Sequence, residues 1–580
     1  MKIGVDFGST YSTFAAYDEV TDQPSILSME EGRPATLPTM VSRSMKNGEW
    51  NFGNGAKDLV GNKKQQIFEA FKMLLVEENQ SVIQRRGYSE EHTPRAVSQR
   101  FLHSVLDKIR DRYGEDLTDV VVCVPEIWGS KMGKALDGRA ILKDILTTEA
   151  DGSSADRRVR VVTEPEAASA FFAYNYEKKT EAAFNGHLLL IDYGGGTLDL
   201  TLTKVSSDGK GIMEISYCAS GGVGENHTDI HGNNTIGNAG IAFMQDVVIR
   251  AMKEQGYLEE GEEINYTDPA FLRAVKELES KLVNRSADIQ FNFGKFGSYH
   301  HVKKILNRDP ISFTDLDYGD DGLEITYQHI FRSYQDVIEK VLDQETKTIN
   351  EKVEAAIGMD PCSPEAGTVG NFKIAVVGGF GSFYLVKHQI DYIYGIDPDE
   401  ENDLRLRDID GDKKETAIAL GASLIASDRV TLQRIARYSI GVRAVRQDGT
   451  RVASYGINVH QIVTNGVIYP ICRENSDTPT IYANIKGQIT SFVINFTGLP
   501  KQGIPMRLKE EMIAALNQGL DAGAEGLWTC GFSMDESNII SFHAIPYTMH
   551  YTDNRQEIMI PLASYTNLFE AMETNEEDFI

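Results

Sequence analysis

Short apolar runs alternate with amphipathic stretches through roughly the first 430 residues of the chain. The clearest apolar runs predict strands at Lys2–Asp6, Val120–Val124, Val159–Thr163, Leu188–Asp192 and Lys373–Val377. Apolar residues at helical spacing predict helices at Gln65–Glu77, Arg95–Tyr113, Glu166–Glu177, Phe271–Val283 and His329–Ile357. Strands that alternate with helices are typical of α/β architecture, so we expect an α/β fold for this part.

The pattern changes after about Asp428. From Tyr438 to Pro561 the sequence consists of short alternating runs broken by Gly, Asn, Asp and Pro, which predicts a β-rich segment. One stretch in it, Met506–Leu520, has its apolar residues on one helical face and predicts an amphipathic helix.

Composition narrows the class of protein. A chain of 580 residues is too long for one core, and domains of about 100–200 residues suggest two or more. The 58 Lys and Arg against 85 Asp and Glu give a net charge of −27, which disfavours nucleic-acid and anionic-membrane partners. No apolar run reaches the ~20 residues of a membrane span, and the N-terminus has no secretory signal. The five cysteines lie far apart, which argues against a zinc site or disulfide framework and suits a cytoplasmic protein.

Two segments carry the same unusual pattern. IGVDFGSTYSTF and LLIDYGGGTLDL each end an apolar strand on an aspartate, Asp6 or Asp192, and continue through a turn of small residues into a second strand. Such turns let backbone N–H groups approach a polyanion closely. Mg²⁺ on phosphates keeps several waters and needs only one or two carboxylates nearby. A duplicated strand–turn–strand unit therefore predicts two similar lobes that hold a magnesium–triphosphate between them.

Five segments in this order, IGVDFGSTYSTFAAY, VVVCVPEIW, VVTEPEAASAFFAY, LLLIDYGGGTLDLTL and IAVVGGFGSFYLV, resemble the nucleotide-site segments of the actin-like ATPase superfamily. The closest likeness is to the seventy-kilodalton heat-shock chaperones. The resemblance implies an actin-like ATPase domain over residues 1–428, built from two duplicated ribonuclease-H-like lobes of about 1–185 and 186–428. A β-rich domain for substrate or partner binding is expected over residues 429–580.

The resemblance also implies roles for individual residues, by position in the matching motifs. The expected catalytic residues are Lys72, Glu164, Asp192, Thr197 and Asp199. The expected nucleotide-binding residues are Gly8, Ser9, Thr10, Tyr11, Gly194, Gly195, Gly196, Thr197, Gly237, Glu277, Lys281, Gly378, Gly379 and Phe380. Asp6, Asp192 and Asp199 are expected near Mg²⁺, with ATP or ADP as the nucleotide.

Departures from the family pattern point to a divergent, lid-lacking branch. Gly381 and Ser382 follow the adenosine-loop motif where the chaperones usually have Thr-Arg, and no acidic, leucine-rich linker precedes the β-rich segment. Only about 20 residues follow the last predicted strand, so a helical lid is not expected.

The leading functional hypothesis is a slow ATPase of chaperone type, which couples nucleotide state to binding of a polypeptide client or a dedicated protein partner. A co-chaperone or nucleotide exchange factor would suit this activity, whereas nucleic acid and membrane are not expected partners. The alternatives are an actin-like filament-forming or segregation ATPase and a small-molecule kinase of the same superfamily, because fold does not fix function.

Overall fold

The computed structural model describes residues 1–126, 128, 138–208, 213–224, 227–228, 234–235, 237, 239–259, 261–294, 309–368, 371–396, 403, 405, 413–436, 439–445, 451–458, 461–470, 493–497, 504–508, 528–546, 558–561 and 569–571. The chain separates into two compact units. The first comprises Met1–Ile127 and Ile145–Leu432, and the second comprises Trp128–Asp144 and Gln433–Ile580. The functional boundary expected at residue 428 stays a prediction.

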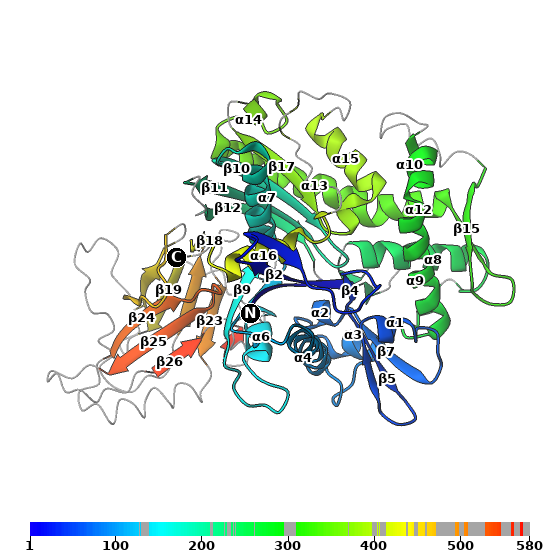
Figure 1. The fold of residues 1–580 in the computed structure, drawn as a ribbon, viewed down its shortest axis with the longest axis horizontal. Coiled ribbons are helices and arrows are strands. Elements are labelled where there is room, and N and C mark those ends of the chain that lie inside the picture. Colours follow the sequence, from blue (N-terminus) through cyan, green and yellow to red (C-terminus); the bar gives the residue numbers. More distant parts are fainter. Residues whose placement is uncertain are drawn as a thin grey trace. The chain divides into compact units, whose positions relative to one another are not determined.

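The first unit contains two central sheets, of which one is built from the N-terminal part of the chain (Figure 1). Its strands in sheet order are β3 (Gln23–Ile26), β2 (Tyr11–Asp18), β1 (Lys2–Phe7), β8 (Asp119–Val124) and β9 (Arg158–Thr163), with β4 (Leu37–Pro38) beside β2. Strand β1 is antiparallel to β2 and parallel to β8, and β8 is parallel to β9. We call this sheet and the elements around it lobe I.

The second central sheet repeats this arrangement and defines lobe II. Its strands in sheet order are β17 (Phe372–Val377), β10 (Gly186–Tyr193), β11 (Leu198–Ser207), β12 (Met213–Val223) and β18 (Val430–Gln433). Strand β10 is antiparallel to β11 and parallel to β17, just as β1 is to β2 and β8. The α/β class is therefore confirmed, and the repeated hairpin with a parallel neighbour agrees with the expected two lobes. Strand β18 shows that the chain after Asp428 first extends this sheet.

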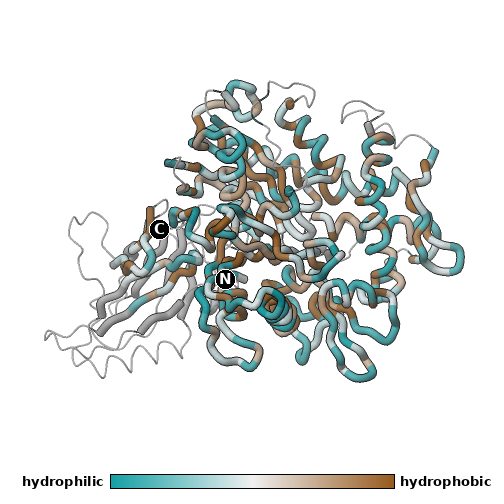
Figure 2. The backbone as a smooth tube through the Cα atoms, viewed as in Figure 1, coloured by the Kyte–Doolittle hydropathy of each residue, from teal (hydrophilic) through white to brown (hydrophobic). Residues whose placement is uncertain are grey.

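Helices α7 (Glu164–Thr180) and α16 (Ala417–Ala426) pack against each other where the two central sheets meet (Figure 1), and hydrophobic segments of the chain gather there (Figure 2). Buried side chains of both sheets join these helices in one cluster. Glycines permit the close approach. A Cβ atom on Gly421 would lie 1.7 Å from the carbonyl oxygen of Ala167, and one on Gly4 of β1 would lie 2.3 Å from the backbone nitrogen of Ser423. The backbone of α16 thus touches both α7 and β1.

Smaller elements surround each central sheet. Lobe I adds a three-stranded sheet and helices: β6 (Trp50–Phe52), β5 (Met40–Ser44), β7 (Gln65–Glu69), α1 (Asn54–Lys57), α2 (Phe71–Leu74), α3 (Gln80–Arg85) and α4 (Pro94–Tyr113). Lobe II adds helices α8 (Gly240–Glu254), α9 (Pro269–Asn284), α10 (Ser286–Gly294), α12 (Tyr327–Ser333), the π-helix η2 (Tyr334–Glu339), α13 (Lys340–Ile357), α14 (Glu365–Thr368), the 3₁₀ helix η3 (Phe380–Ser382) and α15 (Tyr384–Tyr394). Two short ribbons, β13 (His227–Thr228) with β14 (Asn234–Thr235) and β15 (Ser312–Leu316) with β16 (Leu323–Thr326), complete it.

Two predicted helices differ from the structure. The helix predicted at Gln65–Glu77 is strand β7 followed by the short helix α2, because β7 pairs with β5 and Ala70 between them takes a left-handed conformation with φ of 55°. The helix predicted at Met506–Leu520 begins wrongly, since Met506–Leu508 belongs to a strand, and residues 509–520 lie outside the described residues.

The second unit is rich in antiparallel strands in the part that the structure describes. One sheet has the order β20 (Arg451–Ile457), β19 (Ser439–Val445), β22 (Val493–Thr497), β23 (Ile504–Leu508) and β27 (Phe569–Ala571). The other has the order β21 (Tyr469–Pro470), β24 (Trp528–Met534), β25 (Ile540–Pro546) and β26 (Ile558–Pro561). Helix α6 (Gly138–Leu146) reaches this unit, where the Lys143 ammonium lies 2.6 Å from the Asp535 carboxylate.

Candidate functional site

Each central sheet has an aspartate at the same position of its hairpin. Asp6 on β1 lies opposite Thr13, and Asp192 on β10 lies opposite Asp199. Both side chains are buried, with 9% of Asp6 and 3% of Asp192 exposed. The chain then turns through small residues before the second strand of each hairpin begins. The duplicated pattern in the sequence is therefore duplicated in space.

Both turns line one cavity of about 1060 Å³ in the first unit. This volume is at the upper end of the ~300–1,000 Å³ of typical small-molecule pockets, so it is large enough for a nucleotide. The predicted site residues that line it are Asp6, Gly8, Ser9, Thr10, Tyr11, Lys72, Glu164, Asp192, Gly194, Gly195, Gly196, Thr197, Gly378, Gly379 and Phe380.

The two turns face each other so closely that the second one requires glycine. A Cβ atom on Gly195 would lie 2.3 Å from Oγ1 of Thr10, and one on Gly196 would lie 2.8 Å from Oγ of Ser9 and 2.5 Å from Sδ of Met73. Backbone N–H groups in such a turn point outward without side chains around them, which favours an anionic ligand.

A buried charge cluster lies beside the turns. The Lys72 ammonium is paired with the Glu164 carboxylate, and only 2% and 7% of these side chains are exposed. Burial, together with the negative charge of Glu164, raises the pKa of Asp6 to about 7, although Lys72 acts in the opposite direction. Burial, with Glu164, Asp199 and Asp6 nearby, raises the pKa of Asp192 well above its ordinary value. Burial alone would lower the pKa of Lys72, but the attraction of Glu164 and Asp6 outweighs it and raises that pKa.

Local sequence explains where Glu164 lies. It is the first residue of α7, after the N-cap Thr163, whose hydroxyl accepts a hydrogen bond from the Glu166 amide while the Glu166 carboxylate accepts from the Thr163 amide. This capping box fixes the start of the helix, and Pro165 favours the same position. A carboxylate in the first turn is stabilised by the helix dipole. Glu164 is thus both a helix-start acid and a cavity residue.

The carboxylates fit a magnesium ion that is held mainly by phosphate and water. Oδ2 of Asp192 is buried and has no hydrogen-bond partner among the described residues. Within the same residues, no group of three or more His, Cys, Asp or Glu side chains is arranged to bind a metal ion unaided. Mg²⁺ bound to phosphates needs only one or two carboxylates, so an unpartnered aspartate oxygen beside a phosphate-sized cavity suits it.

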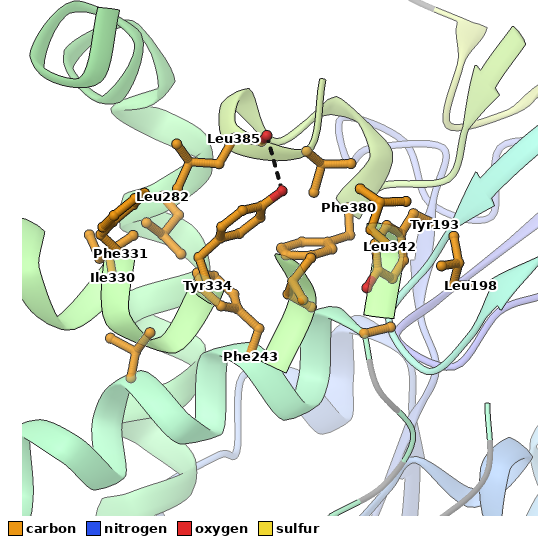
Figure 3. Close-up of a cluster of buried hydrophobic side chains, with 14 of the residues drawn as sticks. Tyr193, Leu198, Phe243, Leu282, Ile330, Phe331, Tyr334, Leu342, Phe380 and Leu385 are labelled. Atoms are coloured by element: carbon orange, nitrogen blue, oxygen red, sulfur yellow. Dashed lines mark hydrogen bonds between the residues drawn. The ribbon is translucent and has the colours of Figure 1, made fainter. Parts of the chain in front are cut away.

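The loop at Gly378–Phe380 is held by its aromatic residue. The Phe380 ring packs against Tyr193 and Phe243 (Figure 3) with ring centroids 5.4 and 5.2 Å apart. It also stacks on Phe383 with ring centroids 5.4 Å apart. Tyr334 closes the same cluster, and its hydroxyl donates to the Leu385 carbonyl oxygen over 3.1 Å (Figure 3). The ring of Phe380 therefore belongs mainly to the lobe II core, and the loop presents its backbone to the cavity.

Four predicted site residues are not among the residues that line the cavity. On α9, Glu277 accepts a hydrogen bond from the Asp317 amide at 3.0 Å, and Lys281 pairs with Glu277 at 3.7 Å. Gly237 lies behind the second turn, since its Cβ atom would be 1.9 Å from the Gly196 carbonyl oxygen. Asp199 is fully buried across the hairpin from Asp192.

A different face of α9 meets the cavity, through residues that the sequence analysis did not select. Lys276 and Glu279 line it, with Nζ of Lys276 3.3 Å from Oε2 of Glu279 and 3.7 Å from Oε2 of Glu69 in lobe I. Gln245 of α8 also lines it. The sequence holds one feature that links these two residues: Lys276 and Glu279 are three positions apart, which places them on one face of a helix.

Comparison with known proteins identifies the N-terminal part of the chain. The Hsp70 protein family model matches residues 2–222, which include both hairpins, Lys72 and Glu164. Residues 2–222 of the chain are therefore similar to the Hsp70 family.

Curated relatives agree over a similar length. A "Chaperone protein dnaK" of Thalassiosira pseudonana is 26% identical over 233 residues, which cover 37% of this chain and 35% of the relative. Proteins of the same name from Metamycoplasma hominis (26% over 225 residues; 39% and 32% covered) and Halobacterium salinarum (28% over 200 residues; 34% and 28% covered) are also similar. The chain spans about a third of the length of these curated relatives.

Among the helices that the structure describes, none combines the length and the apolar character that crossing a membrane requires.

Proposed function

We propose that the chain binds and hydrolyses ATP and that its nucleotide state controls the binding of a polypeptide client or dedicated protein partner. The observation that carries the proposal is one cavity, lined by two facing small-residue turns and a buried Lys72–Glu164 pair, between two similar lobes. The Hsp70 match over residues 2–222 supports it.

The roles of the residues follow from where they lie. The backbone amides at Gly8–Tyr11 and Gly195–Thr197 bind the phosphates, while the Gly194 amide closes the second turn by donating to the Thr197 carbonyl oxygen. The loop at Gly378–Phe380 borders the nucleoside. Lys72 neutralises charge on the transferred phosphoryl group. Glu164 and Thr197 orient the attacking water, with Asp199 behind them. Phosphoryl transfer depends mainly on such positioning and charge stabilisation.

Asp6 and Asp192, with Asp199 behind Asp192, are the residues that would hold Mg²⁺ through water. The ion would supply neutralisation of phosphate charge. Because burial raises the pKa values of Asp6 and Asp192, a cation bound beside them would favour their ionised forms.

Residues 429–580 are the proposed partner-binding part. Steady-state ATP hydrolysis by the full chain, measured with and without a reduced, carboxymethylated protein as unfolded polypeptide, tests the coupling. We expect slow hydrolysis that the unfolded polypeptide accelerates. Hydrolysis that does not respond to it would contradict the client-coupled function.

Two further assays separate the alternatives. ATP-dependent pelleting of the protein would favour a filament-forming ATPase. ATP consumption that requires an added sugar or organic acid would favour a kinase.

A further inference from the structure

A guanidinium from lobe I lies on an aromatic ring of lobe II beside the cavity. Arg86 follows α3, and its guanidinium carbon is 3.5 Å from the centroid of the Tyr266 ring, which precedes α9. Both residues are buried, with 9% and 6% of their surfaces exposed. Burial lowers the pKa of Arg86 to about 10, so the guanidinium remains charged at neutral pH. A stacked, desolvated guanidinium is among the stronger cation–π arrangements.

The neighbouring chain fixes the place of Arg86. The Gln66 side-chain amide donates to the Gly87 carbonyl oxygen over 2.8 Å, and the Tyr88 hydroxyl donates to the Glu69 carbonyl oxygen over 2.8 Å. Gly87 has φ of +84°, and a Cβ atom there would lie 3.0 Å from Cγ2 of Thr267 in lobe II. The corner of lobe I at Arg86 and Gly87 is therefore seated directly on lobe II.

Arg86 also determines how the Gln245 amide is turned. Nη1 of Arg86 donates to Oε1 of Gln245 over 3.4 Å. A guanidinium has only donors, so the amide must present its oxygen to Arg86. The amide nitrogen of Gln245, with two N–H donors, is then the polar atom left for a ligand in the cavity that this residue lines.

The position of Gln245 on α8 indicates which part of a nucleotide it meets. Gly240 at the start of α8 donates its amide to the Gly194 carbonyl oxygen of the second turn. Five residues further along a helix correspond to ~7.5 Å. Helix α8 packs against α9, and Gln245 lines the same cavity as Lys276 and Glu279 of α9.

We propose that Gln245 donates a hydrogen bond to an oxygen of the bound nucleotide's sugar–phosphate part and that Arg86 is its positioning residue. This inference rests on the proposed function. Because Arg86 comes from lobe I and Gln245 from lobe II, the donor is aimed only while the two lobes are in contact. The pair thus makes nucleotide affinity depend on lobe closure.

The test is the affinity and dissociation rate of MgADP in the full chain, for wild type, Gln245→Met, Arg86→Met and the double variant. One lost hydrogen bond predicts about fivefold to tenfold weaker binding in either single variant. The double variant is expected to have the same MgADP affinity as whichever single variant binds MgADP less tightly, because Arg86 acts through Gln245. Gln245→Glu, which keeps an oxygen for Arg86 but has no N–H, is expected to weaken binding at least as much as Gln245→Met.

Arg85→Met is the matched control. It removes the same charge next door and breaks the Arg85–Glu263 pair, which also joins the lobes at 3.1 Å but is exposed. We expect its affinity to stay within about twofold of wild type, as for other exposed pairs. Thermal unfolding verifies that each variant folds, and Arg86→Lys replaces Arg86→Met where the latter does not.

The outcomes separate the inference from the proposed function. A folded wild type that binds no MgADP overturns the proposed function itself. If the wild type binds MgADP and the Gln245→Met and Arg86 variants bind it with the same affinity, only this inference is overturned. It is also overturned if the losses of binding free energy add up in the double variant, or if Gln245→Glu binds MgADP more tightly than Gln245→Met. If Gln245→Met and wild type bind 2′,3′-dideoxy-ADP with the same affinity, the acceptor is a sugar hydroxyl. If Gln245→Met loses as much affinity for 2′,3′-dideoxy-ADP as for ADP, the acceptor is a phosphate oxygen.

Discussion

Replacing Lys72 with methionine removes the cation that the buried carboxylates share. Its ammonium is paired with Glu164, and both side chains are at least nine-tenths buried. Lys72 also opposes the rise in the pKa values of Asp6 and Asp192. Methionine nearly preserves the volume, so the change is mainly one of charge.

The expected loss of stability is large. Breaking a buried ion pair by removing one partner costs about 3–5 kcal/mol, because the remaining charge stays in a dry interior. Protonation can relieve part of this cost. Asp6, whose pKa is already about 7, takes up a proton more readily once Lys72 is gone. The loss should therefore be near the upper end of that range at pH 8 and smaller at pH 6.

Glu164→Gln in the same chain provides the internal check. With both charges removed, the buried pair becomes neutral, so the double variant should be less destabilised than the sum of the single variants by at least about 1 kcal/mol. Hydrolysis should behave differently: single-turnover cleavage of ATP should fall on the order of 10²–10³-fold in Lys72→Met and should not recover in the double variant.

Denaturant unfolding without nucleotide measures the free energy of unfolding, and rapid-quench hydrolysis measures the single-turnover rate of ATP cleavage. Lys57→Met is a suitable control, since Lys57 also lines the cavity but is exposed, and within the described residues its ammonium donates to the Tyr11 hydroxyl at 3.1 Å. Additive effects of the Lys72 and Glu164 changes would refute the charge cluster. Normal hydrolysis by Lys72→Met with normal ATP binding would remove Lys72 from the mechanism.

Three further predictions concern pH, packing and the nucleotide pocket. The pKa of Asp6 is about 7 in the folded protein against an ordinary 3.8, so the protonated carboxyl stabilises the fold fully below pH 3.8 and this contribution is lost as the pH rises to 7. For one group the stability of the nucleotide-free protein falls by at most about 1.4 kcal/mol per pH unit. Asp6→Asn should flatten this fall between pH 5 and pH 7. Gly421→Ala should destabilise the protein in thermal unfolding by more than the ~1–3 kcal/mol typical of overpacking, because its Cβ atom would lie 1.7 Å from the backbone oxygen of Ala167. Lys276→Met should weaken MgADP binding about tenfold in calorimetry, as loss of one charged contact does, whereas Lys281→Met should leave it unchanged.

Each of these has a contradicting result. An unchanged pH profile in Asp6→Asn would mean that this carboxylate is ionised throughout. A fully stable Gly421→Ala would show that α16 and α7 can separate without cost. Equal effects at Lys276 and Lys281 would contradict a specific contact of the nucleotide with Lys276, and a loss only in Lys281→Met would place the nucleotide on the other face of α9.

Sequence patterns predicted the parts of the fold that local residues determine. The duplicated hairpins could be predicted because their pattern is local: an aspartate ends an apolar strand, small residues follow it, and this pattern occurs at two positions of the chain. Helix α7 was predicted at Glu166–Glu177 from apolar residues at helical spacing, and in the structure it begins slightly earlier, at Glu164, after the N-cap Thr163. The α/β class followed from the alternation of such elements.

The features that the sequence did not predict depend on contacts between distant segments. Gln65–Glu69 has helical spacing but pairs as a strand with β5, and no local signal announces that partner. On α9 the family resemblance pointed to Glu277 and Lys281, whose roles stay predictions, whereas the structure places Lys276 and Glu279 of the same helix on the cavity wall. Which face of a helix meets a cavity is decided by packing across the fold. The Arg86–Gln245 contact joins residues 159 positions apart and had no sequence signature.

Isothermal titration calorimetry of the full chain with ADP, with and without magnesium, tests the central claim most directly. We predict one nucleotide per chain, tighter binding with magnesium, and loss of that magnesium dependence in Asp192→Asn. Absence of binding heat from folded protein over a range of temperatures, with either nucleotide diphosphate or triphosphate, would contradict a nucleotide site between the two lobes.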